Sequence, residues 1–236
     1  MRMIEMRDLR RFRTHVEILK HSHPELVIQL VHESPDNPVE ITGDWPDCVL
    51  KWRGKTMHSV KSPEGESKHL LDRMKFAAGR SYVVFGIGLG HLADGARRRL
   101  PDKSGLIVVE PDLRILRESM GCVDLRPLLF DPRIKWVSGK DWREHFRIAM
   151  RQMEESGYWP STGILSLPAY RAYMGGDLSE ARRILAQFLN ERNIDTETKK
   201  VLWDMWNRNL TANLPAIFSS APVRNFSKTF EGVPAV

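Results

Sequence analysis

The sequence has only two cysteines among its 236 residues, Cys48 and Cys122, and they lie far apart in the chain. Two isolated cysteines form neither a disulfide framework nor the paired spacing of a zinc site. No apolar stretch approaches the ~20 residues of a membrane-spanning helix, and the charged N-terminus lacks the apolar core of a signal peptide. We therefore expect a reduced, cytoplasmic protein with no membrane partner and no bound metal.

A strong concentration of basic residues is also missing, although the formal charge is +6 and the isoelectric point is near 9.4. The lysines and arginines are dispersed, and the clusters at residues 7–13 and 97–99 lie in expected helices, where a solvated face explains them. No zinc-finger spacing or aromatic-basic RNA-binding signature accompanies them. Nucleic acid is therefore not an expected partner.

Residues 1–54 predict a small N-terminal subdomain that contains a helix and is rich in β-structure. Apolar residues between positions 3 and 20 recur mostly at steps of three and four, which indicates an amphipathic helix. Three short apolar segments then predict strands, separated by Pro- and Asp-containing clusters at 34–38 and 43–47. The expected strands are residues 25–31, 39–41 and 49–52.

Residues 55–175 alternate between helical and strand patterns. The expected helices are residues 64–78, 90–100, 112–120 and 142–155. The expected strands are residues 82–85, 106–110, 134–137 and 163–167. The strands are short and apolar without polar alternation, as in a sheet covered on both faces. This pattern predicts an α/β domain with a Rossmann-like, methyltransferase-like sheet that is mostly parallel and doubly wound.

Residues 176–236 predict a C-terminal helical extension. A helical run over 178–209 resumes over 210–218, and the spacing of Trp203 and Trp206 indicates core residues. The last residues, Ala235 and Val236, resemble the opening of a strand. We expect a connector that leads into a further domain beyond this sequence.

The strand over 82–85 runs into a glycine loop formed by Gly86, Gly88 and Gly90. Such a loop lets a ligand approach the backbone at a helix N-terminus, and Glu110, at the end of the next strand, suits ribose hydroxyls. Asp141, after the third strand, is the candidate for contact with adenine. These five residues are the candidate cofactor site, for S-adenosylmethionine or another adenosine ligand. The alternative is that the glycines only shape a turn.

Catalytic partners for this loop are missing from the sequence. Residues 166–170, SLPAY, stand where some methyltransferases carry Asn-Pro-Pro-Tyr, but Ser replaces the Asn and Leu the first Pro. No HExxH motif, serine nucleophile elbow or Walker-type lysine occurs. Among the histidines, His21, His23 and His58 are the candidate ligands or bases, although a lone histidine is more often structural. We assign no catalytic residue.

Several motifs, taken in order, resemble one family. They are MHSVKSPEGE at 57–66, VFGIGLGH at 84–91, VVEPD at 108–112, NLTANLP at 209–215 and FEGVPAV at 230–236. The set resembles the N-terminal part of the motility-associated-factor (Maf) flagellin glycosyltransferases, whose central region is also described as 6-hydroxymethylpterin-diphosphokinase-like. Residues 1–54 match no family motif.

The resemblance implies an accessory domain that scaffolds a catalytic domain or docks the acceptor, and that is not catalytic alone. It implies two partners: the catalytic domain of the same protein and flagellin, which receives nonulosonic acids in that family. The alternatives are an S-adenosylmethionine-dependent methyltransferase and an adenosine-ligand binding module.

Overall fold

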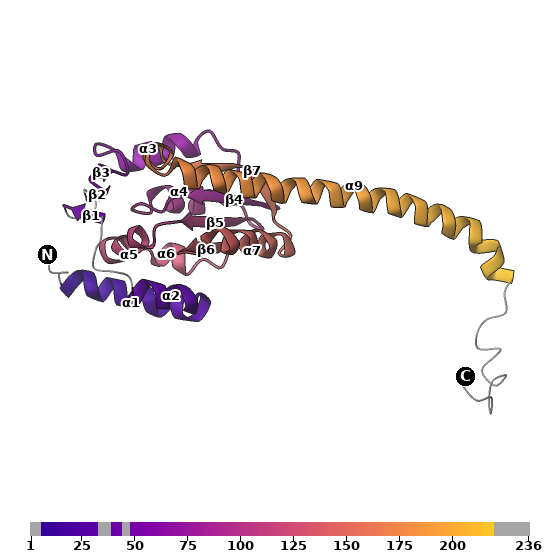
Figure 1. The fold of residues 1–236 in the computed structure, drawn as a ribbon, viewed down its shortest axis with the longest axis horizontal. Helices are drawn as coiled ribbons and strands as arrows, with labels where there is room; N and C mark the ends of the chain where they lie inside the picture. Colours follow the sequence, from indigo (N-terminus) through magenta and orange to yellow (C-terminus); the bar gives the residue numbers. More distant parts are fainter. Residues whose placement is uncertain (1–5, 33–38, 44–47, 220–236) are drawn as a thin grey trace, which may run out of the picture. The chain divides into compact units, whose positions relative to one another are not determined.

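The structure is a computed structural model that describes residues 6–32, 39–43 and 48–219 (Figure 1). The chain divides into two compact units, Met1–Leu189 and Asn190–Val236. The predicted boundaries after residues 54 and 175 stay predictions. The predicted turn cluster at 34–38, most of that at 43–47, and the motif at 230–236 lie outside the described residues.

The first unit is built on a parallel sheet of four strands (Figure 1). The strands are β4 (Arg80–Phe85), β5 (Gly105–Glu110), β6 (Ile134–Ser138) and β7 (Trp159–Ser166). Their order across the sheet is β6-β5-β4-β7, so the direction of winding reverses between β4 and β7. In register, Val84 lies between Val108 of β5 and Leu165 of β7. The predicted Rossmann-like parallel sheet is therefore confirmed.

Helices connect successive strands of this sheet, as parallel pairing requires. The connecting helices are α4 (His91–Arg99), α5 (Leu113–Cys122), α6 (Arg126–Leu129) and α7 (Trp142–Glu155). Helix α3 (Pro63–Leu71) precedes β4, and α8 (Pro168–Tyr173) and α9 (Gly175–Ser219) follow β7. Helix α7 packs on β5, β6 and β7, whereas α4 and α5 pack on β5. All six residues of β5 are buried, which explains why this strand has no polar alternation.

The N-terminal segment contains one element that differs from the prediction. Helices α1 (Met6–Ser22) and α2 (Pro24–Val31) precede a small antiparallel sheet of β1 (Val39–Thr42), β2 (Val49–Trp52) and β3 (Lys55–Thr56). The predicted strand over residues 25–31 is wrong, because this segment is α2. Proline at the helix start favours this conformation, and Leu26, Val27 and Leu30 are buried at helical spacing.

Two helices differ in length from the predictions. Helix α3 ends at Leu71, seven residues before the predicted end, where the Met74 N–H donates to the Leu71 carbonyl. Helix α9 runs through Asn209 without the predicted interruption. None of the helices in the described part of the chain combines the length and apolar character needed to cross a membrane.

The two ends of α9 differ in what surrounds their apolar side chains. Within the first unit, Leu178, Ala181, Ile184, Leu185 and Phe188 are buried at helical spacing. In the second unit, Trp203 and Trp206 stack with their ring centroids 6.4 Å apart, yet both side chains are about 60% exposed. The interpretation of these two tryptophans as core residues is therefore wrong for this chain.

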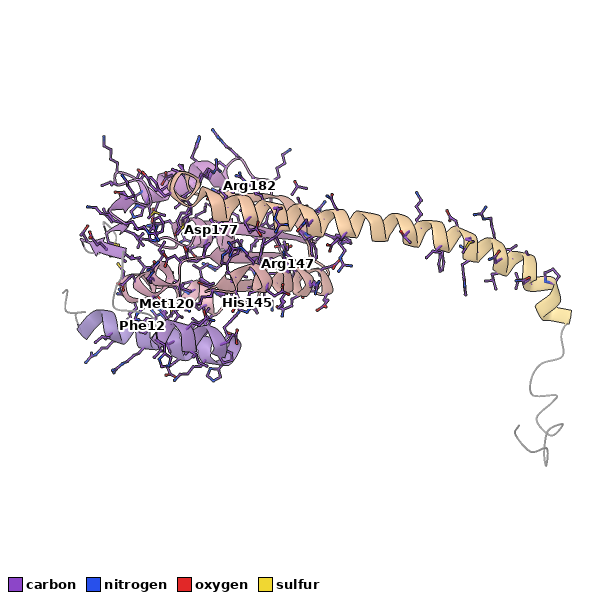
Figure 2. All side chains as sticks on the ribbon, viewed as in Figure 1. Phe12, Met120, His145, Arg147, Asp177 and Arg182 are labelled. Carbon is purple, nitrogen blue, oxygen red and sulfur yellow. The ribbon has the colours of Figure 1, made fainter. Side chains whose placement is uncertain are left out.

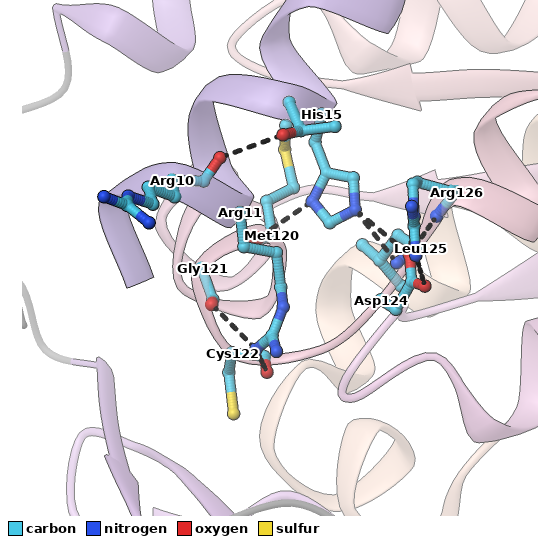
Figure 3. A network of polar contacts seen from close by, with 10 residues as sticks. Arg10, Arg11, His15, Met120, Gly121, Cys122, Asp124, Leu125 and Arg126 are labelled. Atoms are coloured by element: carbon cyan, nitrogen blue, oxygen red, sulfur yellow. Dashed lines mark hydrogen bonds and ion pairs between the residues drawn. The ribbon is translucent and has the colours of Figure 1, made fainter. Parts of the chain in front are cut away.

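Helix α1 is joined to the C-terminal end of α5 by a buried histidine (Figure 3). His15 is fully buried, and its Nδ1–H donates to the Met120 carbonyl oxygen over 2.8 Å. Its Nε2 accepts from the Leu125 N–H over 3.2 Å. Figure 2 labels Met120 of α5 and Phe12 of α1, two helices that pack together. The neutral imidazole thus satisfies one buried donor and one buried acceptor of the backbone.

Burial lowers the pKa of His15, because the charged ring would lose its hydration. The Met120 carbonyl and the Asp124 carboxylate, 3.6 Å from Nε2, favour the imidazolium but do not outweigh this effect. In the unfolded chain the ring takes up a proton below pH ~6.5. The unfolded state therefore binds more protons than the folded state below that pH, and acidification destabilises the fold through His15.

We expect His15→Leu to lower the free energy of unfolding by ~1–3 kcal/mol at pH 8, because Leu125 N–H and the Met120 carbonyl lose a buried partner. The difference from the wild type should shrink as the pH falls from 6.5 to 5. Urea unfolding across this range measures both, with the exposed His21→Leu as the matched control. A difference that is constant with pH would contradict the role given to His15.

Candidate functional site

The glycine loop follows β4 and leads into α4, as predicted. Gly86, Gly88 and Gly90 have φ values of 92°, 48° and 83°, in the region that favours glycine. The Gly86 N–H donates to the Val109 carbonyl of β5, and Gly90 is the N-cap of α4. All three glycines are buried. The loop is therefore a tight strand-to-helix turn whose backbone conformation favours glycine at all three positions.

A tyrosine of the same chain occupies this loop. Tyr170, in α8 just after β7, is fully buried, and its hydroxyl accepts a hydrogen bond from the Gly88 N–H over 3.0 Å. The ring lies against Gly86, where a Cβ atom would stand 2.5 Å from three ring carbons. Phe85 contacts the ring edge-on, with centroids 6.2 Å apart. Because β4 and β7 flank the reversal of winding, Tyr170 fills the crevice in which such sheets bind their ligands.

The Glu110 carboxyl group accepts hydrogen bonds from Tyr170 and from the backbone around the glycine loop. The Tyr170 hydroxyl donates to its Oε2 over 2.6 Å, and the Ile87 N–H donates to the same oxygen over 3.0 Å. Its Oε1 accepts from the Asp112 N–H over 3.1 Å, and the residue is 1% exposed. Burial raises the pKa of Glu110 to about 8, although these three hydrogen bonds favour the carboxylate. Burial likewise raises the pKa of Tyr170, together with the neighbouring Glu110 carboxyl.

The structure thus brings three of the five predicted site residues, Gly86, Gly88 and Glu110, into contact with Tyr170. Gly90 lies in the same loop but faces Leu125 and Leu128, and Asp141 lies apart. Asp141 is exposed at the start of α7, and its side chain makes no capping hydrogen bond there. Binding of a cofactor by these residues stays a prediction, and such a ligand would have to displace Tyr170. The signal that could have identified Tyr170 is its place at the end of the SLPAY segment after β7.

A separate cleft opens at the carboxyl ends of β5 and β6, and the sequence did not predict it. Its volume is about 770 Å³, and its lining comes from the segments after β5 and β6, the β2–β3 hairpin, α2 and the start of α9. Four cations line it: Arg53, Arg114, Lys140 and Arg143. Helices α5 and α7 both begin at this cleft, so their N-terminal dipoles add to its positive potential.

Two of the four cations are paired with acids in the wall of the cleft. Arg114 makes a bidentate ion pair with Asp112, at 2.8 and 2.7 Å. Burial favours the neutral acid, but hydrogen bonds from Arg114 and Trp52 outweigh it and lower the pKa of Asp112. Arg143 lies 3.2 Å from Asp177, in the first turn of α9 (Figure 2). Among the described residues, Arg53 and Lys140 have no carboxylate within ion-pair distance, so their charges face the cleft uncompensated.

Aromatic rings accompany these cations. Trp52, Trp142 and Tyr173 line the cleft, and the Arg53 guanidinium stands 4.4 Å from the centre of the Trp52 ring. Arg53 and Gly54 form the two-residue loop between β2 and β3, with φ values of 49° and 72°. Asparagine, aspartate or glycine is favoured at such positions, so an arginine there has an unfavourable backbone conformation. Cations beside aromatic rings suit an anionic ligand with a ring.

The three candidate histidines lie in different places. His58 is buried and structural, because its Nε2 accepts from the Leu50 N–H over 3.1 Å and its Nδ1–H donates to the Ser59 carbonyl over 3.0 Å. His21 is exposed on α1. His23 lines a smaller hollow of about 320 Å³ with Lys135 and His145, where burial lowers its pKa. The structure does not bring the three together.

The first unit is thus a Rossmann-like α/β domain in which Tyr170 fills the glycine loop and a basic cleft lies at the ends of β5 and β6. No family model matches the chain, and no curated protein does. Among solved structures, the chain is similar to a MAf glycosyltransferase from Magnetospirillum magneticum AMB-1, with a TM-score of 0.45 and 16% identity over 75% of this chain. The match covers 35% of the length of that protein.

Substitution of the loop glycines by alanine tests the packing of Tyr170. We expect Gly88→Ala to cost ~1–2 kcal/mol, which is the price of a left-handed conformation alone, because its Cβ has room 3.8 Å from Leu167. Gly86→Ala should cost ~1–3 kcal/mol more, since its Cβ overlaps the Tyr170 ring. Urea unfolding of the two variants measures the difference. Equal losses would show that Tyr170 does not pack on Gly86.

Proposed function

We propose that this chain is the accessory Rossmann-like domain of a Maf-type glycosyltransferase, and that it does not catalyse transfer by itself. The observation that carries the proposal is the Tyr170–Glu110–Gly88 cluster, which fills the crevice that a Rossmann-type enzyme uses for its cofactor. The ordered motifs from residue 57 to residue 236 give the proposal its family.

We propose two partners for this domain. One is the catalytic domain of the same protein, which the domain scaffolds. The other is flagellin, the acceptor, which docks at the cleft lined by Arg53, Arg114, Lys140 and Arg143. The support for docking at the cleft is its uncompensated positive charge beside the exposed Tyr173 ring, which suits an acidic or glycosylated surface.

The methyltransferase and adenosine-module alternatives give a different result with S-adenosylhomocysteine. We expect no change in the melting temperature of the wild type at millimolar ligand, because Tyr170 and Glu110 already bind each other. A ligand present at 100 times its Kd would stabilise the protein by ~2.7 kcal/mol, which is easily detected. Calorimetry provides the second measurement. Saturable binding that is lost in Glu110→Gln would overturn the proposal in favour of the methyltransferase reading.

Docking at the cleft is tested with flagellin from the same organism by biolayer interferometry. We expect the double variant Arg53→Ser/Lys140→Ser to bind about tenfold or more weakly, because two unpaired cations are removed from the interface. The matched control is Lys75→Ser/Arg151→Ser, which removes two exposed charges that do not line the cleft. The same affinity for both variants would show that the cleft is not the docking site.

A further inference from the structure

The fold brings together the two cysteines that the sequence separates. Cys48 directly precedes β2, and Cys122 is the last residue of α5. Their Sγ atoms lie 3.4 Å apart, and no bond joins them. Because the length of a disulfide bond is about 2.0 Å, the two sulfur atoms would have to approach by only ~1.4 Å. These are the only cysteines of the 236 residues, so neither has a competing thiol in the chain.

The position of Cys122 is fixed from the side of α1 (Figure 3). The Arg11 guanidinium donates from Nη1 to the carbonyl oxygens of both Gly121 and Cys122. His15 holds the preceding carbonyl, that of Met120. Three successive carbonyl groups at the end of α5 therefore have side-chain partners on one neighbouring helix. This anchoring limits the movement of the Cys122 backbone.

Cys48 directly precedes the first paired residue of the antiparallel sheet, Val49. Strand β2 pairs with β1 through the register Thr42–Val49 and Ile41–Leu50. The Leu50 N–H is bonded to the His58 ring, and its carbonyl accepts from the Met57 N–H over 3.0 Å. Cys48 is 1% exposed, whereas Cys122 is only half-buried. A small oxidant can therefore reach Cys122 but not Cys48.

We propose that Cys48 and Cys122 form a reversible intramolecular disulfide by exchange with a small-molecule disulfide. The Cys122 thiolate attacks oxidised glutathione, forms a mixed disulfide and releases one glutathione thiolate. The Cys48 thiolate then attacks Sγ of Cys122 and releases the second glutathione. Two protein thiols are oxidised and one glutathione disulfide is reduced, and the two protons lost by the protein thiols are taken up, through solvent, by the two glutathione thiolates.

The bond would join two elements that form the wall of the basic cleft. Trp52, at the end of β2, donates from Nε1 to the Asp112 carboxylate over 2.7 Å, and Asp112 caps the start of α5. With the thiols reduced, this hydrogen bond and packing hold the sheet to α5. With the disulfide formed, a covalent link holds them as well. Any effect of this disulfide on flagellin docking at the cleft depends on the proposed function. The formation of the disulfide itself does not depend on it.

The test is the intact mass of the chain after the folded protein is exposed to excess oxidised glutathione and then quenched with N-ethylmaleimide in denaturant, where both thiols are accessible. We expect a product lighter by two hydrogens that carries neither glutathione nor maleimide. Its melting temperature should be ~5–10 °C above that of the reduced chain, because the bond closes a long loop in the unfolded state. A reductant should reverse both changes.

Two variants separate this chemistry from ordinary thiol oxidation. Cys48→Ala should stop at one glutathione adduct on Cys122, since the resolving thiol is absent. Cys122→Ala should remain unmodified while folded, since Cys48 is buried. A stable glutathione adduct on the wild type, disulfide-linked dimers, or two maleimide adducts after the exposure would each overturn the proposal. Because the readout is a mass, failure of flagellin docking has no bearing on it.

Discussion

The hydrogen bond between the Tyr170 hydroxyl and the Glu110 carboxyl, 2.6 Å long, determines what the glycine loop can do. It joins the last residue of β5 to α8, which follows β7, across the end of β4, and the Gly88 N–H donates to the same hydroxyl. With this bond in place, the positive φ angles of the loop serve the close packing of an aromatic ring on Gly86. The loop keeps the glycine spacing predicted for a cofactor site, but the Tyr170 side chain of the same chain occupies its space.

The basic cleft lies beyond the ends of β5 and β6, and its cations come from segments as distant as the β2–β3 hairpin and α7. The N-terminal segment is therefore part of the site as well as of the packing, since it supplies Trp52 and Arg53. The anchoring of α1 on α5 through His15 holds this segment against the Rossmann-like sheet.

The parallel sheet could be predicted because its strands are short, buried on both faces and separated by helical periods. The segment that became α2 could not, because an apolar run such as ELVIQLV fits a strand and a helix equally well. The glycine loop and Glu110 were visible in the sequence, but Tyr170 filling the loop depends on pairing of β4 with β7. The cleft and the proximity of Cys48 to Cys122 arise from tertiary packing, which local patterns do not encode.

Tyr170, which fills the glycine loop, comes late in the sequence, and this has a consequence for how the chain folds. The Gly88 N–H finds its partner 82 positions later, and Glu110 finds the same hydroxyl 60 positions later. During synthesis the loop therefore stays without this partner until β7 and α8 have left the ribosome. Contacts of such long sequence separation close late and slow folding. The addition of the last strand, β7, therefore both completes the crevice and brings in Tyr170, which fills it.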